Sequence, residues 1–217
     1  MFLFLIASLP LLFCLVALLP WSARQTPRSL TLVSTFLKGV LLFFPGYLAL
    51  LIVRRIFGFS YDGFLLFLSL LQRDHLFPLL AAVGGFLLLQ RSLSILGTDE
   101  SIFLTVFACV SGFLSVMNIA DGLRTWGNWD GYVLFLLPGL RAAAALAVAL
   151  AAQRFYTWEG RDGLLFCGAA GACALALAVI SFLYSVSRVG WSILLCVLFV
   201  LTGVAVVAMR FPRAVRG

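Results

Sequence analysis

The residues best suited to chemistry lie inside long apolar runs of this sequence or directly beside them. Arg141 falls in the middle of an apolar run, and Gln72, Arg73, Asp74 and His75 stand together between two others. A guanidinium binds anions through paired hydrogen bonds, and a neighbouring aspartate and histidine are able to exchange protons. Arg141 and these four neighbours, here called the QRDH group, are the first candidates for a functional site.

The composition indicates that lipid is part of the solvent of this chain. Of its 217 residues, 64% are hydrophobic and 11% are charged, whereas soluble domains are about half apolar and about a quarter charged. Long unbroken apolar runs predict membrane-spanning helices, because barrel strands would alternate apolar and polar residues. The expected fold is all-α, a polytopic membrane helix bundle that forms a single domain over residues 1–217 and contacts the lipid bilayer.

Seven apolar runs are long enough to cross a bilayer core, which needs roughly 20 residues of helix. The predicted spans are 2–21, 30–53, 76–96, 102–120, 131–152, 164–186 and 191–209. The first is alternatively a cleaved signal peptide, although it lacks a basic region before its apolar run. Counts of six and eight spans stay open as alternatives to seven.

The QRDH group decides how residues 56–75 are interpreted. We expect it at the membrane interface, where Asp74 caps a span whose first turn holds Pro78. One alternative makes 64–89 a single long span with the polar group in its interior. The other makes 56–71 a separate crossing.

Arg141 lies ~15 Å from either end of its predicted span, at 1.5 Å per residue. At this depth we expect a carboxylate partner, a polar cavity or an anionic ligand. Pro138 and Gly139 precede it and loosen the helix, and broken helices beside buried charges are typical of transporter sites. For a purely structural role, the candidate partners are Asp121, Asp130 and Asp74.

Polar residues on two other spans extend this list of candidates. Lys38, the only lysine, precedes a second helix-breaking pair, Pro45 and Gly46. Asn118 continues a polar stripe on the fourth span that ends at Asp121. The other members of this stripe are Ser111 and Ser115.

Small residues predict how the helices pack. Ala143, Ala147 and Ala151 recur at four-residue spacing on the fifth span, and Gly168 with Ala172 does so on the sixth. Such faces allow close helix contact in membranes. We therefore expect the fifth and sixth spans at the centre of the bundle, and the first and seventh against lipid.

The two halves of the chain share similar segments in the same order. Residues 40–46, 61–67 and 86–96 resemble residues 133–139, 161–166 and 182–194. Two three-span repeats plus one final span would produce this pattern, and an odd-numbered repeat is inverted in the membrane. More arginines flank the side of the C-terminal tail than the other side, which predicts a cytoplasmic C-terminus and, with seven spans, an external N-terminus.

No motif predicts a cofactor, a metal or a catalytic residue. HExxH and GxxxxGK[ST] are absent, and one histidine is too few for a zinc triad. The net charge of +7 is spread over the flanks of the apolar runs, which indicates contact with lipid headgroups rather than nucleic acid.

The leading functional interpretation is a small transporter or permease component of the cell inner membrane that binds a small anionic solute near Arg141. The other candidate solute-binding residues are Lys38, Arg73, Asp74, His75, Asn118 and Asp121. One alternative is a non-catalytic subunit that joins other membrane subunits or copies of itself, which predicts an ion-paired Arg141 and an open small-residue face. Another is a lipid-modifying enzyme that uses the aspartate and histidine of the QRDH group at the headgroup level.

Overall fold

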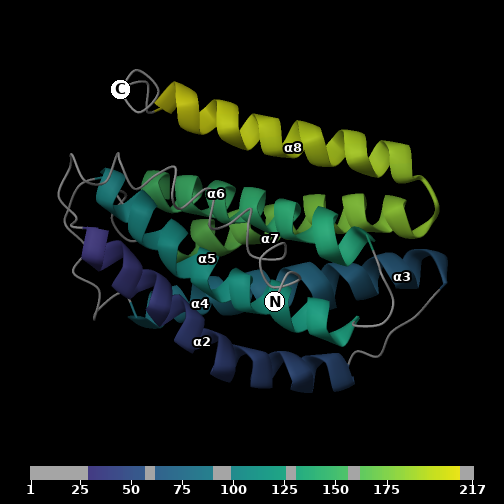
Figure 1. The fold of residues 1–217 in the computed structure, drawn as a ribbon, viewed down its shortest axis with the longest axis horizontal. Helices are drawn as coiled ribbons and strands as arrows, with labels where there is room; N and C mark the ends of the chain where they lie inside the picture. The colour runs from purple at the N-terminus through teal and green to yellow at the C-terminus, as the bar shows by residue number, and fades with distance from the viewer. Residues whose placement is uncertain (1–28, 57–61, 90–98, 126–130, 156–161, 211–217) are drawn as a thin grey trace.

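All regular structure in the described part of the chain is helical. The computed structural model describes residues 29–56, 62–89, 99–125, 131–155 and 162–210. In chain order the elements are α2 (Ser29–Ile56), α3 (Gly63–Ser69), the π-helix η1 (Leu70–Leu76), α4 (Phe77–Leu89), α5 (Asp99–Arg124), the π-helix η3 (Tyr132–Leu136), α6 (Leu137–Phe155), α7 (Asp162–Ser185) and α8 (Val189–Arg210). They lie side by side along one long axis (Figure 1), which confirms the predicted all-α bundle.

Helix length and hydropathy support a multi-pass membrane protein. Four segments are long and apolar enough to cross a membrane: Leu32–Val53, Gly63–Leu89, Ile102–Arg124 and Tyr132–Ala152. Two shorter apolar helices, Ala170–Ser185 and Val189–Gly203, accompany them. These six segments correspond to six of the seven predicted spans, and predicted span 2–21 lies outside the described residues.

The helix that carries the QRDH group begins earlier than expected. A continuous helical segment runs from Gly63 through η1 to Leu89, so the predicted start of this span at residue 76 is wrong. The structure supports the alternative of one long span over 64–89. The capping role expected for Asp74 is absent because this residue lies within η1.

Both π-helical segments end two residues before a proline. The N–H of Phe77 donates to the carbonyl of Gln72, and Pro78 follows. Likewise the N–H of Leu137 donates to the carbonyl of Tyr132, just before Pro138. Proline has no N–H and its ring collides with the carbonyl four residues earlier. The wider π turn relieves that collision while keeping the preceding backbone hydrogen-bonded.

Helices α2 and α5 run in the same direction (Figure 1) and meet at a crossing made close by two glycines. A Cβ built on Gly39 would lie 2.0 Å from the carbonyl oxygen of Cys109. Reciprocally, one on Gly112 would lie 2.2 Å from the carbonyl oxygen of Phe36. Only hydrogen fits at either position, so these backbones touch, as small residues permit in membrane bundles.

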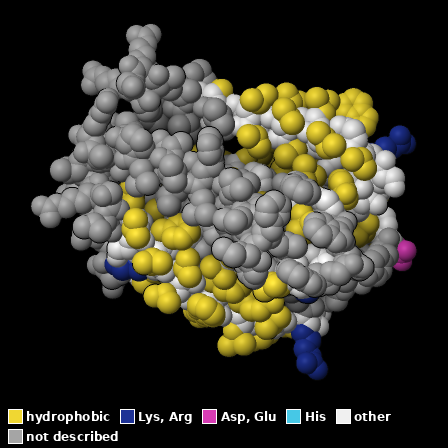
Figure 2. Space-filling view, viewed as in Figure 1, with side chains coloured by type: hydrophobic (Ala, Val, Ile, Leu, Met, Phe, Trp, Pro, Cys, Tyr) yellow, Lys and Arg dark blue, Asp and Glu magenta, His cyan; other side chains and the backbone are white. Residues whose placement is uncertain are grey.

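The position of each helix follows its apolar surface. Most of α5 is buried, and α5 packs between α2 and α6. Helices α2 and α8 lie on opposite sides of the bundle (Figure 1) and carry exposed leucines and other apolar side chains. Figure 2 shows these side chains as broad hydrophobic areas on the visible face, as expected for contact with lipid.

The seventh span, α8, carries exposed apolar side chains, which is consistent with its expected placement against lipid. The buried alanines of α6 confirm the central position expected for the fifth span. The sixth span is only partly central. Gly168, Ala172, Leu175 and Val179 follow one face of α7 and are exposed. Helix α7 thus buries its opposite face alone.

Candidate functional site

A buried ion pair links α5 to α6. Arg141 Nη2 donates to Oδ2 of Asp121 at 2.7 Å, and Nη1 donates to Oδ1 of Asn118 at 2.8 Å. Arg141 is only 2% exposed, which makes it a fully buried large side chain. Asn118 and Asp121 are three residues apart on α5 and share one face, so a single guanidinium contacts both.

A second group of polar side chains meets on Ser181 of α7. Nε2 of His75, in η1, lies 2.7 Å from the Ser181 hydroxyl oxygen. The hydroxyl of Tyr132, in η3, contacts the same oxygen. Both π-helical segments therefore contribute one side chain to this contact, and π-helical turns occur frequently at functional sites.

The protons in this group can be assigned by counting donors. Ser181 has one hydroxyl proton, which it donates to the carbonyl of Leu177 at 2.8 Å. The Ser181 oxygen must then accept from Nε2–H of His75 and from the hydroxyl of Tyr132. A proton on Nδ1 would add a buried charged donor without an acceptor in the described part of the chain, which is unfavourable, so we assign His75 as the neutral tautomer whose Nδ1 bears the lone pair. Nδ1 is buried and has no hydrogen-bond partner among the residues that the structure describes.

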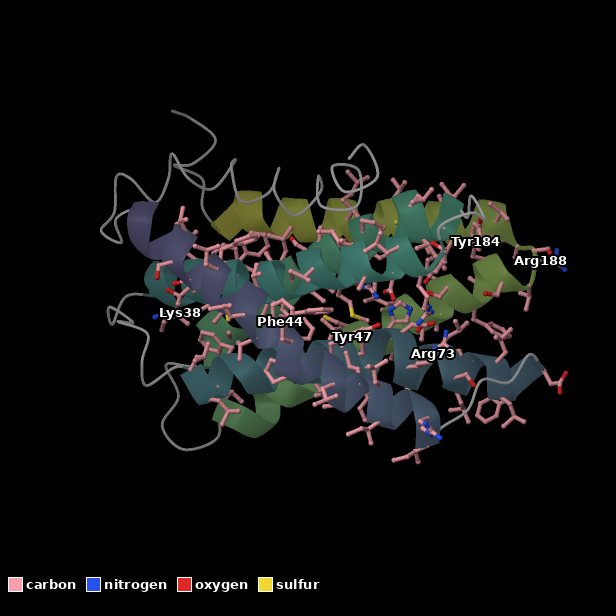
Figure 3. The ribbon with its side chains drawn as sticks, turned by 60° about the horizontal axis from the view of Figure 1, so that its bottom comes forward. Lys38, Phe44, Tyr47, Arg73, Tyr184 and Arg188 are labelled. Carbon is pink, nitrogen blue, oxygen red and sulfur yellow. The ribbon has the colours of Figure 1, made fainter. Side chains whose placement is uncertain are left out.

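The two groups form one polar cluster, defined here as His75, Asn118, Asp121, Tyr132, Arg141 and Ser181. Arg141 and Asp121 lie close enough to act electrostatically on both His75 and Tyr132. In Figure 3, nitrogen and oxygen atoms gather inside the bundle toward the end that carries Arg73 and Tyr184. Four parts of the chain therefore bring their polar groups to one interior region.

The polar stripe predicted on α5 leads away from this cluster. Ser111 and Ser115 are buried, and their hydroxyl oxygens have no partner among the described residues. Other helical hydroxyls, such as those of Ser69 and Ser181, donate to the carbonyl four residues earlier. With Asn118, the two serines form a buried polar row at helical spacing.

The remaining candidates lie outside the polar cluster. Nε of Arg73 donates to Oδ1 of the adjacent Asp74 at 3.1 Å, and both side chains are partly exposed. Lys38 lies at the opposite end of the bundle from Arg73 (Figure 3). The sequence thus names four members of the polar cluster, which are His75, Asn118, Asp121 and Arg141.

The predicted helix breaks differ from each other. Pro138 is the second residue after η3 and lies three residues before Arg141. Helix α2 continues through Pro45 and Gly46 without interruption. Gly46 serves packing instead, since a Cβ there would lie 2.7 Å from the ring of Phe113.

Tyr132 and Ser181 were not recognised from the sequence. A lone serine in an apolar span usually bonds to its own helix backbone, as Ser181 also does. Tyr132 opens its span and has the pattern of an interfacial aromatic residue. For Tyr132 the available signal was Pro138, which follows it by six residues as Pro78 follows His75 by three. No proline follows Ser181 at such a distance.

No group of three or more metal-binding side chains occurs within the described residues. The chain matches no family model, and neither a curated protein nor a solved structure is significantly similar to it. Function must therefore be inferred from the polar cluster and its surroundings.

Proposed function

We propose that the chain is a small transporter or permease component that binds a small anionic solute at the polar cluster. The observation that carries this proposal is the buried polar row on α5, from Asp121 and Asn118 to Ser115 and Ser111. Polar groups inside transmembrane bundles mark solute and ion pathways. A bundle that needed only stability would be served as well by apolar side chains at these positions.

Arg141 is the group that would recognise the solute. A guanidinium presents five N–H donors in a planar fork, and the bonds to Asn118 and Asp121 engage its two Nη atoms. Those two partners hold the fork in place, so little side-chain freedom is lost when an anion binds to it. The solute must be small, because the surrounding side chains are closely packed.

Uptake into proteoliposomes tests this function. We would reconstitute the full chain and measure uptake of labelled nitrate, lactate, phosphate and sulfate. The double variant Arg141→Gln/Asp121→Asn removes both charges together and so avoids a lone buried charge. Arg188→Gln is the matched control, since Arg188 is exposed between α7 and α8.

We expect saturable uptake of at least one anion by the wild type and by the control, and its loss in the double variant. Uptake equal to that of protein-free liposomes for all four anions, from folded protein, would refute the proposal. Equal uptake by wild type and double variant would show that Arg141 does not bind the solute.

A second candidate is a non-catalytic membrane subunit, which two observations favour. Arg141 is ion-paired, and Gly168 with Ala172 forms an exposed small-residue face on α7. Such faces associate helices in lipid. If copies of the chain associate through this face, light scattering will show particles heavier than one 23.7 kDa chain. The variant Gly168→Leu should reduce these particles to monomers. A monomeric wild type would contradict self-assembly.

The burial of His75 argues against the lipid-modifying alternative. His75 is 1% exposed and lies near the middle of segment Gly63–Leu89, ~18 Å from its start at 1.5 Å per residue. Acid–base chemistry on a headgroup needs a side chain that the headgroup can reach.

A further inference from the structure

We infer that the solute is a monovalent anion and that it enters the polar cluster together with one proton, which binds Nδ1 of His75. This inference rests on the proposed function and specifies the class of solute and its coupling ion. It follows from the charge balance of the polar cluster and from the hydrogen bonds of its histidine.

The charges of the polar cluster already cancel before any solute binds. Arg141 contributes one positive charge and Asp121 one negative charge, and they are paired at 2.7 Å. His75 is assigned as neutral, because a proton on its buried Nδ1 would find no acceptor among the described residues. An anion arriving alone would leave one uncompensated negative charge in an apolar interior, which is strongly unfavourable.

Nδ1 of His75 is the atom suited to receive the compensating proton. It bears a lone pair, is buried, and lacks a partner within the described ranges. Once protonated, Nδ1–H becomes a charged donor, and an oxygen of the anion is able to accept its hydrogen bond. The bond from Nε2–H to Ser181 is unaffected by this step, so the ring keeps its orientation.

The other groups around His75 are less suited to this role. Arg73 and Asp74, on the same π-helical segment, are paired with each other. Asp121 on α5 is held by Arg141, and the hydroxyl of Tyr132 on η3 is bonded to Ser181 of α7, the helix that packs most closely against η1. Figure 3 also labels Tyr47 on α2, and Tyr184 and Arg188 toward this end of the bundle; a phenol and a guanidinium already carry their protons, so none of them takes up another.

The binding step balances in charge. One proton and one monovalent anion leave the water, the proton bonds to Nδ1, and the anion lies between the imidazolium and the guanidinium. The occupied polar cluster carries two cations, His75 and Arg141, and two anions, Asp121 and the solute. Release to the other side returns both ions to water, so transport is electroneutral with one proton per anion.

The single histidine of the chain allows a direct test. In protein labelled with ¹⁵N-histidine, NMR would resolve one pair of ring nitrogens. We expect a protonated Nε2 and an unprotonated Nδ1 without anion, and protonation of both nitrogens when nitrate or lactate binds. Isothermal titration of the same samples shows whether binding has occurred. A ring that stays neutral while the anion binds would overturn the inference and leave the proposed function intact.

Transport supplies the second test, in liposomes that contain a pH-sensitive dye and a sulfate background. With the membrane potential clamped by potassium and valinomycin, addition of potassium nitrate should acidify the interior by one proton per nitrate taken up. His75→Gln retains a side-chain amide able to donate to Ser181 but has no proton site, so acidification should be lost. Arg188→Gln should acidify like the wild type.

The outcomes separate the two proposals. Nitrate or lactate uptake without acidification overturns proton coupling but not transport. Acidification that survives in His75→Gln and is lost in Asp121→Asn would assign the proton to the wrong residue and also overturns the inference. Absence of both uptake and binding for these anions overturns the monovalent class, and absence for phosphate and sulfate as well removes the proposed function.

Discussion

The crossing of α2 and α5 at Gly39 leads to a sharp prediction about stability. An alanine Cβ at residue 39 would lie 2.0 Å from the carbonyl oxygen of Cys109 and 2.9 Å from its carbonyl carbon. Real Cβ contacts are essentially never closer than 3.0 Å, so the helices must separate by about 1 Å (3.0 − 2.0). Neither atom of Cys109 can turn aside, because both belong to the α5 backbone.

The cost of Gly39→Ala can be estimated from this displacement. A gap of about 0.5–1 Å forfeits roughly a quarter to a half of the dispersion energy of each contact across it. Overpacking of this kind costs about 1–3 kcal/mol, and replacing a helical glycine by alanine recovers up to about 1 kcal/mol. We expect a net loss of about 1–2 kcal/mol, or roughly 2–8 °C in Tm for a chain of this length.

Thermal unfolding of the detergent-purified protein, followed by a thiol-reactive dye, provides the measurement. Cys109 is 1% exposed and should react only after unfolding. The control is Gly84→Ala in α4, where no described atom lies within 4 Å of an added Cβ. That variant should melt at or slightly above the wild-type temperature. If Gly39→Ala melts as high as Gly84→Ala, the close crossing does not exist as described.

Three further predictions concern the α7–α8 turn and the polar cluster. Ser187 has a φ of 62°, a left-handed conformation that costs an L-residue about 1–2 kcal/mol, so Ser187→Gly should raise Tm; an unchanged or lower Tm would contradict this. Ser181→Ala removes the acceptor of two buried donors and should lower the free energy of unfolding by about 1–3 kcal/mol. Ser185→Ala loses only a bond to its own helix and should be nearly neutral. Equal losses in the thermal unfolding of the two variants would refute the contact on Ser181. Arg141→Met should cost about 3–5 kcal/mol, because it removes the guanidinium that is paired with the buried Asp121 carboxylate. The double variant Arg141→Met/Asp121→Leu should recover most of that loss, and additive losses in the same assay would show that the two residues do not interact.

Helix positions were predictable because lipid imposes them. A crossing helix satisfies its own backbone, so an apolar run of sufficient length is itself the signal. The same reasoning failed at residue 76, where four consecutive polar residues resembled the end of a span. In the structure, His75 bonds to Ser181 across the bundle, and Arg73 and Asp74 bond to each other, so the bundle itself satisfies these polar groups.

The partners of Arg141 were predictable only as a set. Depth in the span required a carboxylate or an anion, and Asp121 was one of three candidates by position. The choice among them depends on how α5 and α6 rotate against each other, which hydropathy does not encode. The stripe through Asn118 pointed to the correct helix, whereas the contacts of Ser181 arise from helices far apart in the sequence.

The π-helical segment η1 also determines how the exposed face of α3 is rotated relative to the buried face of α4. Before it, α3 exposes Phe64 and Leu65, while after it α4 buries Leu79 and Phe86. Removing one residue from Leu70–Leu76 would let the segment close into an ordinary α-helix and would rotate everything on one side of the deletion by about 100° relative to the other. The extra residue in η1 therefore sets the rotation of the exposed face of α3 relative to the buried face of α4. A chain shortened by one residue here would keep its hydropathy but would turn one of these faces away from its present direction.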